Sequence, residues 1–243
     1  MSLKLHFRKH LNGNRLLFQL KQEFDIHWKG SFRGDPVKRS WSEHGEDIVI
    51  ARELEYLLHN GFYVDVGSNH PTKGSNTFKL YRMGMRGITI EPNPTLLYLH
   101  AKYRSADVQL CAACGECDGV AMFYHIATHG LSTLSCERCK ELVASGHHLL
   151  SRSLLPVLTL RTILNKNAFA ERPVFALLSV DAESMDEVVL RSNDWTRDRP
   201  RLVVFEENQG SQSAIDYLSD LGYHPIAKCG SNHVLRLRPE AVP

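Results

Sequence analysis

The sequence lacks the features that mark membrane, secreted and nucleic-acid-binding proteins. No apolar run is long enough to cross a bilayer, and no apolar signal-peptide core follows Met1. The formal net charge of +2 gives no overall field that would attract nucleic acid or an anionic membrane. We also find no internal repeat and no low-complexity segment. We therefore expect a cytoplasmic chain with reduced cysteines, no transmembrane segment and no nucleic-acid partner.

The turn after the strand that contains Asp65 also lacks glycines, because only Gly67 is in place where a dinucleotide-binding turn needs three. Apolar residues flank Asp65 in a short predicted strand, and Gly67 follows that strand. A helix is predicted next, and then a second strand that ends at Glu91. This order is typical of one half of a nucleotide-binding α/β sheet, while the missing glycines conflict with a nicotinamide cofactor.

S-Adenosylmethionine has no pyrophosphate and fits the single glycine better. It needs one close backbone approach, which Gly67 permits, and an acid near its amino-acid end, which Asp65 can supply. Glu91 follows the glycine turn by about two dozen residues, the spacing expected of an acid that accepts from two ribose hydroxyls. The alternative is that Asp65 and Glu91 only cap helices. Parallel sheets bind ligands at the ends of their strands, which favours the cofactor role.

The remaining pattern predicts an α/β domain. Most predicted strands are separated by a helix at short spacing, as in a parallel sheet, and the last two are joined by a short turn that predicts a hairpin. Strands are predicted over 63–66, 87–90, 108–112, 120–125, 175–180, 202–205, 223–227 and 233–237, and helices over 41–60, 76–83, 94–103, 185–191 and 213–221.

Three separated blocks of the chain carry a family resemblance. They are Ser42-Glu43-His44-Gly45-Glu46-Asp47, residues 62–94, and Leu178-Ser179-Val180-Asp181-Ala182-Glu183 with residues 189–195. Together, over residues 41–208, they resemble the FkbM family of S-adenosylmethionine-dependent methyltransferases. The chain departs from the family pattern at Glu43-His44, where a glutamine is usual, and at Ser184, where a glycine is usual.

The resemblance implies a class I methyltransferase-like domain over residues 40–243, with a doubly wound, mostly parallel sheet and an antiparallel C-terminal hairpin. It implies methyl transfer from S-adenosylmethionine to a hydroxyl of a sugar, in a glycan or glycolipid, or of a secondary metabolite. The acceptor would then be a small molecule or a glycan. The alternative is a non-catalytic module that binds S-adenosylmethionine. The expected cofactor-binding residues are Glu46, Asp47, Asp65, Gly67, Ser68, Asn69, Ser75, Glu91, Pro92 and Ala113.

Ordinary structural roles remain open for three of these residues. Glu46 and Asp47 could simply be first-turn acids of the helix over 41–60, with Ser42 as its cap, and Ser75 could cap the helix that follows it. Ala113 is placed beside the adenine only because many such enzymes hold that ring after the third strand.

Acidic residues also follow the strands predicted over 175–180 and 202–205. In the strand order that the resemblance implies, these ends converge near the cofactor's methyl group, where clustered carboxylates repel unless a proton or a cation intervenes. Asp181 and Glu206 are therefore candidates for a direct catalytic base. With Glu207 they could instead bind a divalent cation such as Mg²⁺. A purely structural role in capping the next helices is the third alternative.

Two segments lie outside this pattern. Residues 1–39 form a basic arm with nine Lys or Arg and three acids, and its leucines predict a short amphipathic helix. Such a helix could lie on an anionic membrane, but packing on its own domain or on a partner subunit is the commoner role, which suggests a homo-oligomer. Residues 128–153 form a long irregular insert, typical of a lid or substrate loop.

Four of the six cysteines form two pairs with zinc-site spacing. These pairs are Cys114 with Cys117 and Cys136 with Cys139. Reduced thiols on the surface or in the core are the simpler interpretation, because the first pair follows a predicted core strand and the intervening segment is apolar.

Overall fold

The computed structural model describes residues 39–166, 174–206 and 211–239. Residues 1–38 of the predicted arm lie outside these ranges, so its helix and its role in a homo-oligomer stay predictions. Glu207 also lies outside them. The described residues divide into two compact units, one of residues 121–155 and one of residues 39–120 with 156–239. No helix in the described ranges is long and apolar enough to span a bilayer.

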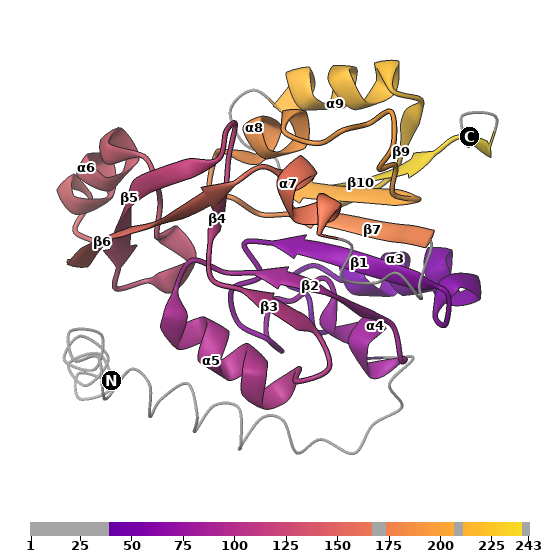
Figure 1. The fold of residues 1–243 in the computed structure, drawn as a ribbon, viewed down its shortest axis with the longest axis horizontal. Helices are drawn as coiled ribbons and strands as arrows, with labels where there is room; N and C mark the ends of the chain where they lie inside the picture. Colours follow the sequence, from indigo (N-terminus) through magenta and orange to yellow (C-terminus); the bar gives the residue numbers. More distant parts are fainter. Residues whose placement is uncertain (1–38, 167–173, 207–210, 240–243) are drawn as a thin grey trace. The chain divides into compact units, whose positions relative to one another are not determined.

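The larger unit is built on a seven-stranded sheet in the order β3-β2-β1-β7-β8-β10-β9 (Figure 1). The strands from β3 to β8 are parallel, and β10 pairs antiparallel with both β8 and β9. This confirms the predicted fold class, including the closing hairpin. The strands are β1 (Gly61–Val66), β2 (Arg86–Ile90), β3 (Val108–Leu110), β7 (Val174–Val180), β8 (Leu202–Glu206), β9 (Tyr223–Cys229) and β10 (Asn232–Leu237).

Helices cover both faces of the sheet, as the doubly wound prediction requires. On one face the apolar side chains of β1, β2, β7 and β8 pack against α7 (Leu160–Asn165), α8 (Asp186–Arg191) and α9 (Ser211–Asp220). On the other face, side chains of β1, β7, β8 and β10 pack against α3 (Glu46–Leu54), the 3-10 turn η1 (Glu55–Leu57) and α4 (Phe78–Arg82). The helix α5 (Pro94–Tyr103) connects β2 with β3. Because β1 is buried on both sides, its alternate residues belong to different cores.

The helix predicted over 41–60 begins later than expected. Its first residue is Glu46, its N-cap is Gly45, and the helical turns end at Leu57. The Asp47 carboxylate explains the late start, because it accepts hydrogen bonds from Ser40 Oγ (2.7 Å), Trp41 N (2.8 Å) and Ser42 Oγ (2.9 Å). Ser42 therefore sits in a loop, although its hydroxyl still accepts from Asp47 N at 3.2 Å.

The insert predicted as irregular is regular in the structure, so that prediction was wrong. The unit of residues 121–155 contains most of β5 (Gly119–Ile126), the 3-10 turn η2 (His129–Leu131), α6 (Cys136–Ala144) and most of β6 (Leu149–Leu158). The strands β5 and β6 join the short β4 (Ala113–Cys114) in a second sheet of order β4-β6-β5. The strand within 149–158 was missed because Ser151, Arg152 and Ser153 interrupt its apolar residues.

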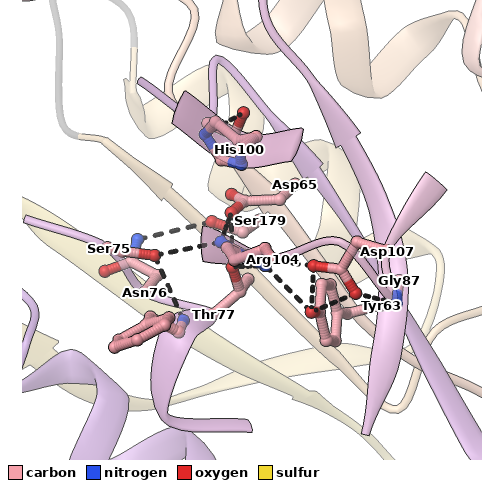
Figure 2. A network of polar contacts seen from close by, with 12 residues as sticks. Tyr63, Asp65, Ser75, Asn76, Thr77, Gly87, His100, Arg104, Asp107 and Ser179 are labelled. Atoms are coloured by element: carbon pink, nitrogen blue, oxygen red, sulfur yellow. Dashed lines mark hydrogen bonds and ion pairs between the residues drawn. The ribbon is translucent and has the colours of Figure 1, made fainter. Parts of the chain in front are cut away.

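A buried guanidinium lies beneath β1. The side chain of Arg104 has 0% exposure and contacts Asp107 through Nε at 2.8 Å. Its Nη2 donates to Tyr63 Oη and to Thr77 Oγ1, both at 2.9 Å. Asp65 is a second, more distant carboxylate, at 3.7 Å from Nη1. Figure 2 shows Arg104 at the centre of this network, which also includes Ser75 and Gly87.

The network connects segments that are far apart in the sequence. The Tyr63 hydroxyl donates to Asp107, and Asp107 also accepts from Gly87 N at 2.9 Å. Burial raises the pKa of Tyr63 well above its usual value, so the phenol keeps its proton and remains a donor. The end of α5 is thereby tied to β1, to β2 and to the loop before α4.

We expect Arg104→Met to lower the free energy of unfolding by about 3–5 kcal/mol, because it leaves Asp107 and Asp65 buried without their cation. Urea unfolding followed by circular dichroism measures this. Arg236→Met is the matched control, since Arg236 pairs with Glu53 at 2.9 Å with 48% of its side chain exposed. That change should cost no more than about 1 kcal/mol. Equal losses in the two variants would contradict the structural role of the Arg104 network.

Candidate active site at the carboxyl edge of the sheet

Three parallel strands end side by side and are joined by backbone hydrogen bonds. Gly67 N donates to Ile90 O at 3.0 Å, and Asp181 N donates to Val66 O at 3.0 Å. Gly67 has φ +70°, and a Cβ there would lie 1.8 Å from the carbonyl oxygen of Asp181. The glycine is thus required by the end of β7, independently of any ligand. A substitution at residue 67 would therefore disturb the packing against β7 whether or not a cofactor binds there.

Glu91 lies directly after β2 and orients two loops. One carboxylate oxygen accepts from Asn69 N at 2.8 Å, and the other accepts from Asn93 N at 2.7 Å. Only 5% of Glu91 is exposed. Burial raises its pKa to about 7, against the opposing effect of the two backbone donors. Each carboxylate oxygen can accept a further hydrogen bond, so the predicted contacts with two ribose hydroxyls remain chemically available.

The loop after Gly67 is held by a neutral histidine. The buried His100 ring of α5 places Nε2 2.9 Å from Asn69 O and 3.3 Å from Ser68 Oγ. Burial, together with the charge of Arg104, lowers the pKa of His100 to about 3, so the ring carries no charge. Asn69 has φ +46°, and its buried Oδ1 has no hydrogen-bond partner among the described residues. That atom is an acceptor available to a ligand.

Hydrogen bonds and an ion pair within the protein orient the Asp65 carboxylate. Its Oδ2 accepts from Thr77 Oγ1, and Ser179 and Arg104 are further partners. Burial raises the pKa of Asp65, while the charge of Arg104 and the two hydroxyls oppose the shift. Ser75 lies in the loop before α4, and its Oγ accepts a hydrogen bond from Phe78 N at 3.1 Å. The capping interpretation of Ser75 therefore describes what its hydroxyl does here.

Glu46 and Asp47 are fully buried and already hydrogen-bonded. Glu46 accepts from Asn232 Nδ2 at 2.6 Å and from His44 N at 3.0 Å, while Asp47 accepts the three donors of residues 40–42. These contacts favour the structural alternative for both acids. Glu46 thereby joins the start of α3 to the β9–β10 turn. His44 lies against the same turn, where a Cβ added to Gly230 would meet its ring at 2.1 Å.

Asp181 occupies the end of β7 among other carboxylates. Desolvation raises its pKa well above the usual range, and the charges of Glu206, Glu183, Asp186 and Asp65 raise it further. Its side chain is nevertheless exposed, so water weakens the desolvation effect, and the repulsion between carboxylates is the more secure cause. A raised pKa makes the ionised carboxylate a stronger proton acceptor, which favours a role as a general base.

Glu206 ends the neighbouring strand β8 and is half-buried. Its Oε1 accepts from Ser231 Oγ of the β9–β10 turn at 3.3 Å. Both strands were expected beside β1; β7 pairs with β1, whereas β8 pairs with β7 instead. The charges of Asp181 and Glu206 nevertheless interact. Across residues 39–166, 174–206 and 211–239, no three His, Cys, Asp or Glu side chains are grouped to hold a metal ion. The predicted third ligand, Glu207, lies outside these ranges.

The predicted adenine side of the site is arranged differently from the expectation. The strand β3 ends at Leu110, and Ala113 lies in β4 with 7% exposure, paired with Val157 of β6. Cys111, which directly follows β3, is exposed to solvent. Burial of its sulfur and the charge of Glu91 both raise the pKa of its thiol, so the two groups are close enough to interact. Pro92, half-buried, follows Glu91 directly.

Sequence reasoning missed Arg104, Asp107, Tyr63 and His100. His100 had a signal, since it lies four residues after Leu96 on the buried side of α5. The Arg104–Asp107 pair looks like an ordinary exposed i,i+3 pair, and no spacing connects it to Tyr63 41 residues earlier.

The cysteine pairs are free thiols in the structure. Cys114 is buried in the core of the larger unit, and Cys117 is exposed. Cys139 is buried against Ile126 and Leu142 of the smaller unit. None belongs to a metal-binding group within the described part of the chain. Their burial fits the interpretation of these cysteines as core and surface thiols.

Comparisons with known proteins agree with this arrangement. A family model described as the methyltransferase FkbM domain matches residues 65–225, well over half of the chain. The chain belongs to this family, which confirms the resemblance. No curated protein matches the sequence.

Solved structures give weaker likenesses. A candidate O-methyltransferase from Klebsiella pneumoniae has a TM-score of 0.43 and 10% identity, covering 90% of this chain and 96% of that one. An O-methyltransferase from Bacillus cereus in complex with SAH has a TM-score of 0.42 and 8% identity, covering 90% of each chain. Human methyltransferase-like protein 13, also in complex with SAH, has a TM-score of 0.37 and 13% identity, covering 81% of each chain.

The turn after β7 stores backbone strain that a glycine would relieve. Ser184 has φ +76°, in the region that favours glycine. We expect Ser184→Gly to raise the free energy of unfolding by about 1 kcal/mol, because the left-handed conformation no longer costs energy. Ser145→Gly is the control, since Ser145 has φ −83° at the C-cap of α6 and gains nothing by the change. A destabilised Ser184→Gly variant in urea unfolding would contradict the strain.

The raised pKa of Glu91 predicts pH-dependent cofactor binding. Ribose hydroxyls donate to the ionised carboxylate, so affinity should be constant above pH 7 and fall by about tenfold per pH unit below it. Calorimetry with 5′-methylthioadenosine tests this without interference from an ionisable amino-acid end. Glu91→Gln should bind more weakly and lose the dependence. A wild-type affinity that does not change between pH 5 and 8 would rule out the ribose contact.

Proposed function

We propose that this FkbM-family methyltransferase transfers a methyl group from S-adenosylmethionine to a hydroxyl of a sugar, in a glycan or glycolipid, or of a secondary metabolite. The observation that carries the proposal is Asp181, an exposed carboxylate at the end of β7 whose pKa is raised by neighbouring acids. A hydroxyl must lose its proton as it attacks a methyl group, and such a carboxylate can accept that proton.

The residues at the strand ends fit the methyl donor. Glu91 offers carboxylate oxygens to two hydroxyls, and the Oδ1 of Asn69 is a buried acceptor without a partner among the described residues. When bound, S-adenosylmethionine supplies an electrophilic methyl group on a sulfonium that leaves readily. Asp181 lies next to Gly67, so the proposed base is on the strand adjacent to the one that starts the cofactor loop.

In the proposed reaction, the protein aligns two groups and moves one proton. The loop of residues 67–77, held by His100 and the Arg104 network, orients the donor. Asp181 accepts the acceptor's hydroxyl proton, and the repulsion from Glu206 that raises its pKa makes it a stronger base than an ordinary aspartate. Alignment and general-base catalysis are sufficient for this displacement.

The divalent cation predicted at Asp181, Glu206 and Glu207 is not used in this mechanism. Mg²⁺ can bind through one or two carboxylates and complete its octahedron with water, and the third expected ligand, Glu207, lies outside the described residues, so the cation stays a prediction. The proposal takes Asp181 as the direct base, because an exposed carboxylate with a raised pKa fits proton transfer without a further group.

We expect Asp181→Asn to lower turnover by roughly 10²- to 10⁴-fold, because the amide cannot accept the proton. Release of S-adenosylhomocysteine over a panel of sugars, glycans and hydroxylated metabolites measures this. In the wild type, the rate should rise with pH through the raised pKa of Asp181, since only the ionised form is a base. Glu187→Gln is the matched control, because this α8 acid pairs with Arg191 and should tolerate the change.

The same variant should become more stable at high pH. For a carboxylate with a raised folded-state pKa, the relative stability is fully present below the unfolded-state pKa and is lost as the pH rises from there through the folded-state pKa, so removing the ionisable group helps only above the unfolded-state value. Asp181→Asn should therefore raise the urea midpoint at pH 8 and not at pH 4. Turnover that is lost in excess EDTA and restored by Mg²⁺ would replace the direct base with a metal. Cofactor binding without turnover across the panel would favour the non-catalytic alternative.

A further inference from the structure

A cysteine pair begins the helix α6 in the unit of residues 121–155. Ser135 is the N-cap, and its Oγ accepts from Arg138 N at 3.1 Å. Cys136 is the first helical residue, and Cys139 follows one turn later, with its N–H bonded to Ser135 O at 3.0 Å. Helical residues three apart lie on one face with Cβ atoms about 5–6 Å apart. This spacing is close enough for a disulfide to form with a small shift at the helix start.

The two thiols differ in access. Cys136 is half-buried, whereas Cys139 is 5% exposed and packs against Ile126 and Leu142. An incoming disulfide can therefore reach Cys136 and not Cys139. The outer cysteine is suited to attack, and the inner one is suited to resolve the mixed disulfide that results.

A hydrogen-bond donor lies at the outer sulfur. The Tyr124 hydroxyl is hydrogen-bonded to Cys136, and this bond is the largest cause of the raised pKa of Tyr124, ahead of burial. The charges of both Cys136 and Cys139 act on the same hydroxyl, which places the two sulfurs near one atom. The outer sulfur therefore lies at the start of α6 with the Tyr124 hydroxyl beside it.

Within the described ranges, no third candidate metal ligand is grouped with this pair. Two cysteines at this spacing occur both in zinc sites and in redox pairs. A structural zinc needs four ligands, and the described ranges contain no group of even three candidate side chains. The chemistry left to two adjacent thiols is reversible oxidation.

We propose that Cys136 and Cys139 form a thiol–disulfide exchange site whose co-substrate is a small-molecule or protein disulfide. The Cys136 thiolate attacks one sulfur of that disulfide, which forms a mixed disulfide and releases the first thiolate of the co-substrate. The Cys139 thiolate then attacks Cys136 Sγ and releases the second. The pair gives up two protons and two electrons, and the co-substrate disulfide is reduced to two thiols.

Glutathione disulfide is the probe for the full chain. Protein is equilibrated in buffers of increasing oxidised glutathione, acid-quenched, alkylated, unfolded and cut with trypsin, which cleaves after Arg138 between the two cysteines. An internal disulfide holds the two fragments together until reductant is added. Tandem mass spectrometry assigns the bonded cysteine, because the fragment that ends at Arg138 begins at Ser105 and also holds Cys111, Cys114 and Cys117. We expect joined fragments to become the main form, while the exposed Cys117 is only glutathionylated.

Variants separate the two roles. Cys139→Ser should keep glutathione on Cys136, and Cys136→Ser should leave the buried Cys139 unmodified. Circular dichroism checks that each variant folds.

Three results would overturn the proposal. These are fragments that stay separate in excess glutathione disulfide, Cys136 joined as often to another cysteine as to Cys139, or purified protein that holds one zinc per chain through this pair.

Discussion

The buried pair of Arg104 and Asp107 is the interaction on which the arrangement of the site depends. A guanidinium with no exposed surface is tolerable only with a close anion and filled donor positions. Asp107, Tyr63, Thr77 and Ser75 supply these partners. Because they come from β1, from the loop before α4 and from the connection between α5 and β3, satisfying one cation positions three segments at once.

The same cation influences the groups above it. Its charge opposes the burial that raises the pKa of Asp65, and it helps to keep His100 neutral. A neutral His100 can donate from Nε2 to Asn69 O, which holds the loop whose N–H contacts Glu91. Glu91 and Asp181, farther along the edge, keep raised pKa values that a site designed only for stability would avoid. The buried network around Arg104 thus supports the loop and the carboxylates at the strand ends, where the chemistry is proposed.

The fold was predictable because apolar strands, short spacings and turn residues all favour one topology. The strand ends and the pairing of β7 with β1 followed the expectation, and so did the antiparallel β10. The start of α3 did not, because Asp47 draws residues 40–42 into a loop, a tertiary effect with no local signal. The regular insert was missed for a related reason. Its β6 is mostly solvent-exposed and carries Arg152, so hydrophobic periodicity is weak there.

The candidate site was predictable by location more than by role. Glu91 and Asp181 lie where the strand ends placed them, yet Gly67 makes room for the carbonyl of Asp181, and Asp65 is bound by Thr77 and Arg104. Much of the recognisable motif therefore builds the edge of the sheet. Residues that build an edge can be shared by enzymes with different acceptors. It follows that the motif identifies the family and does not identify the acceptor.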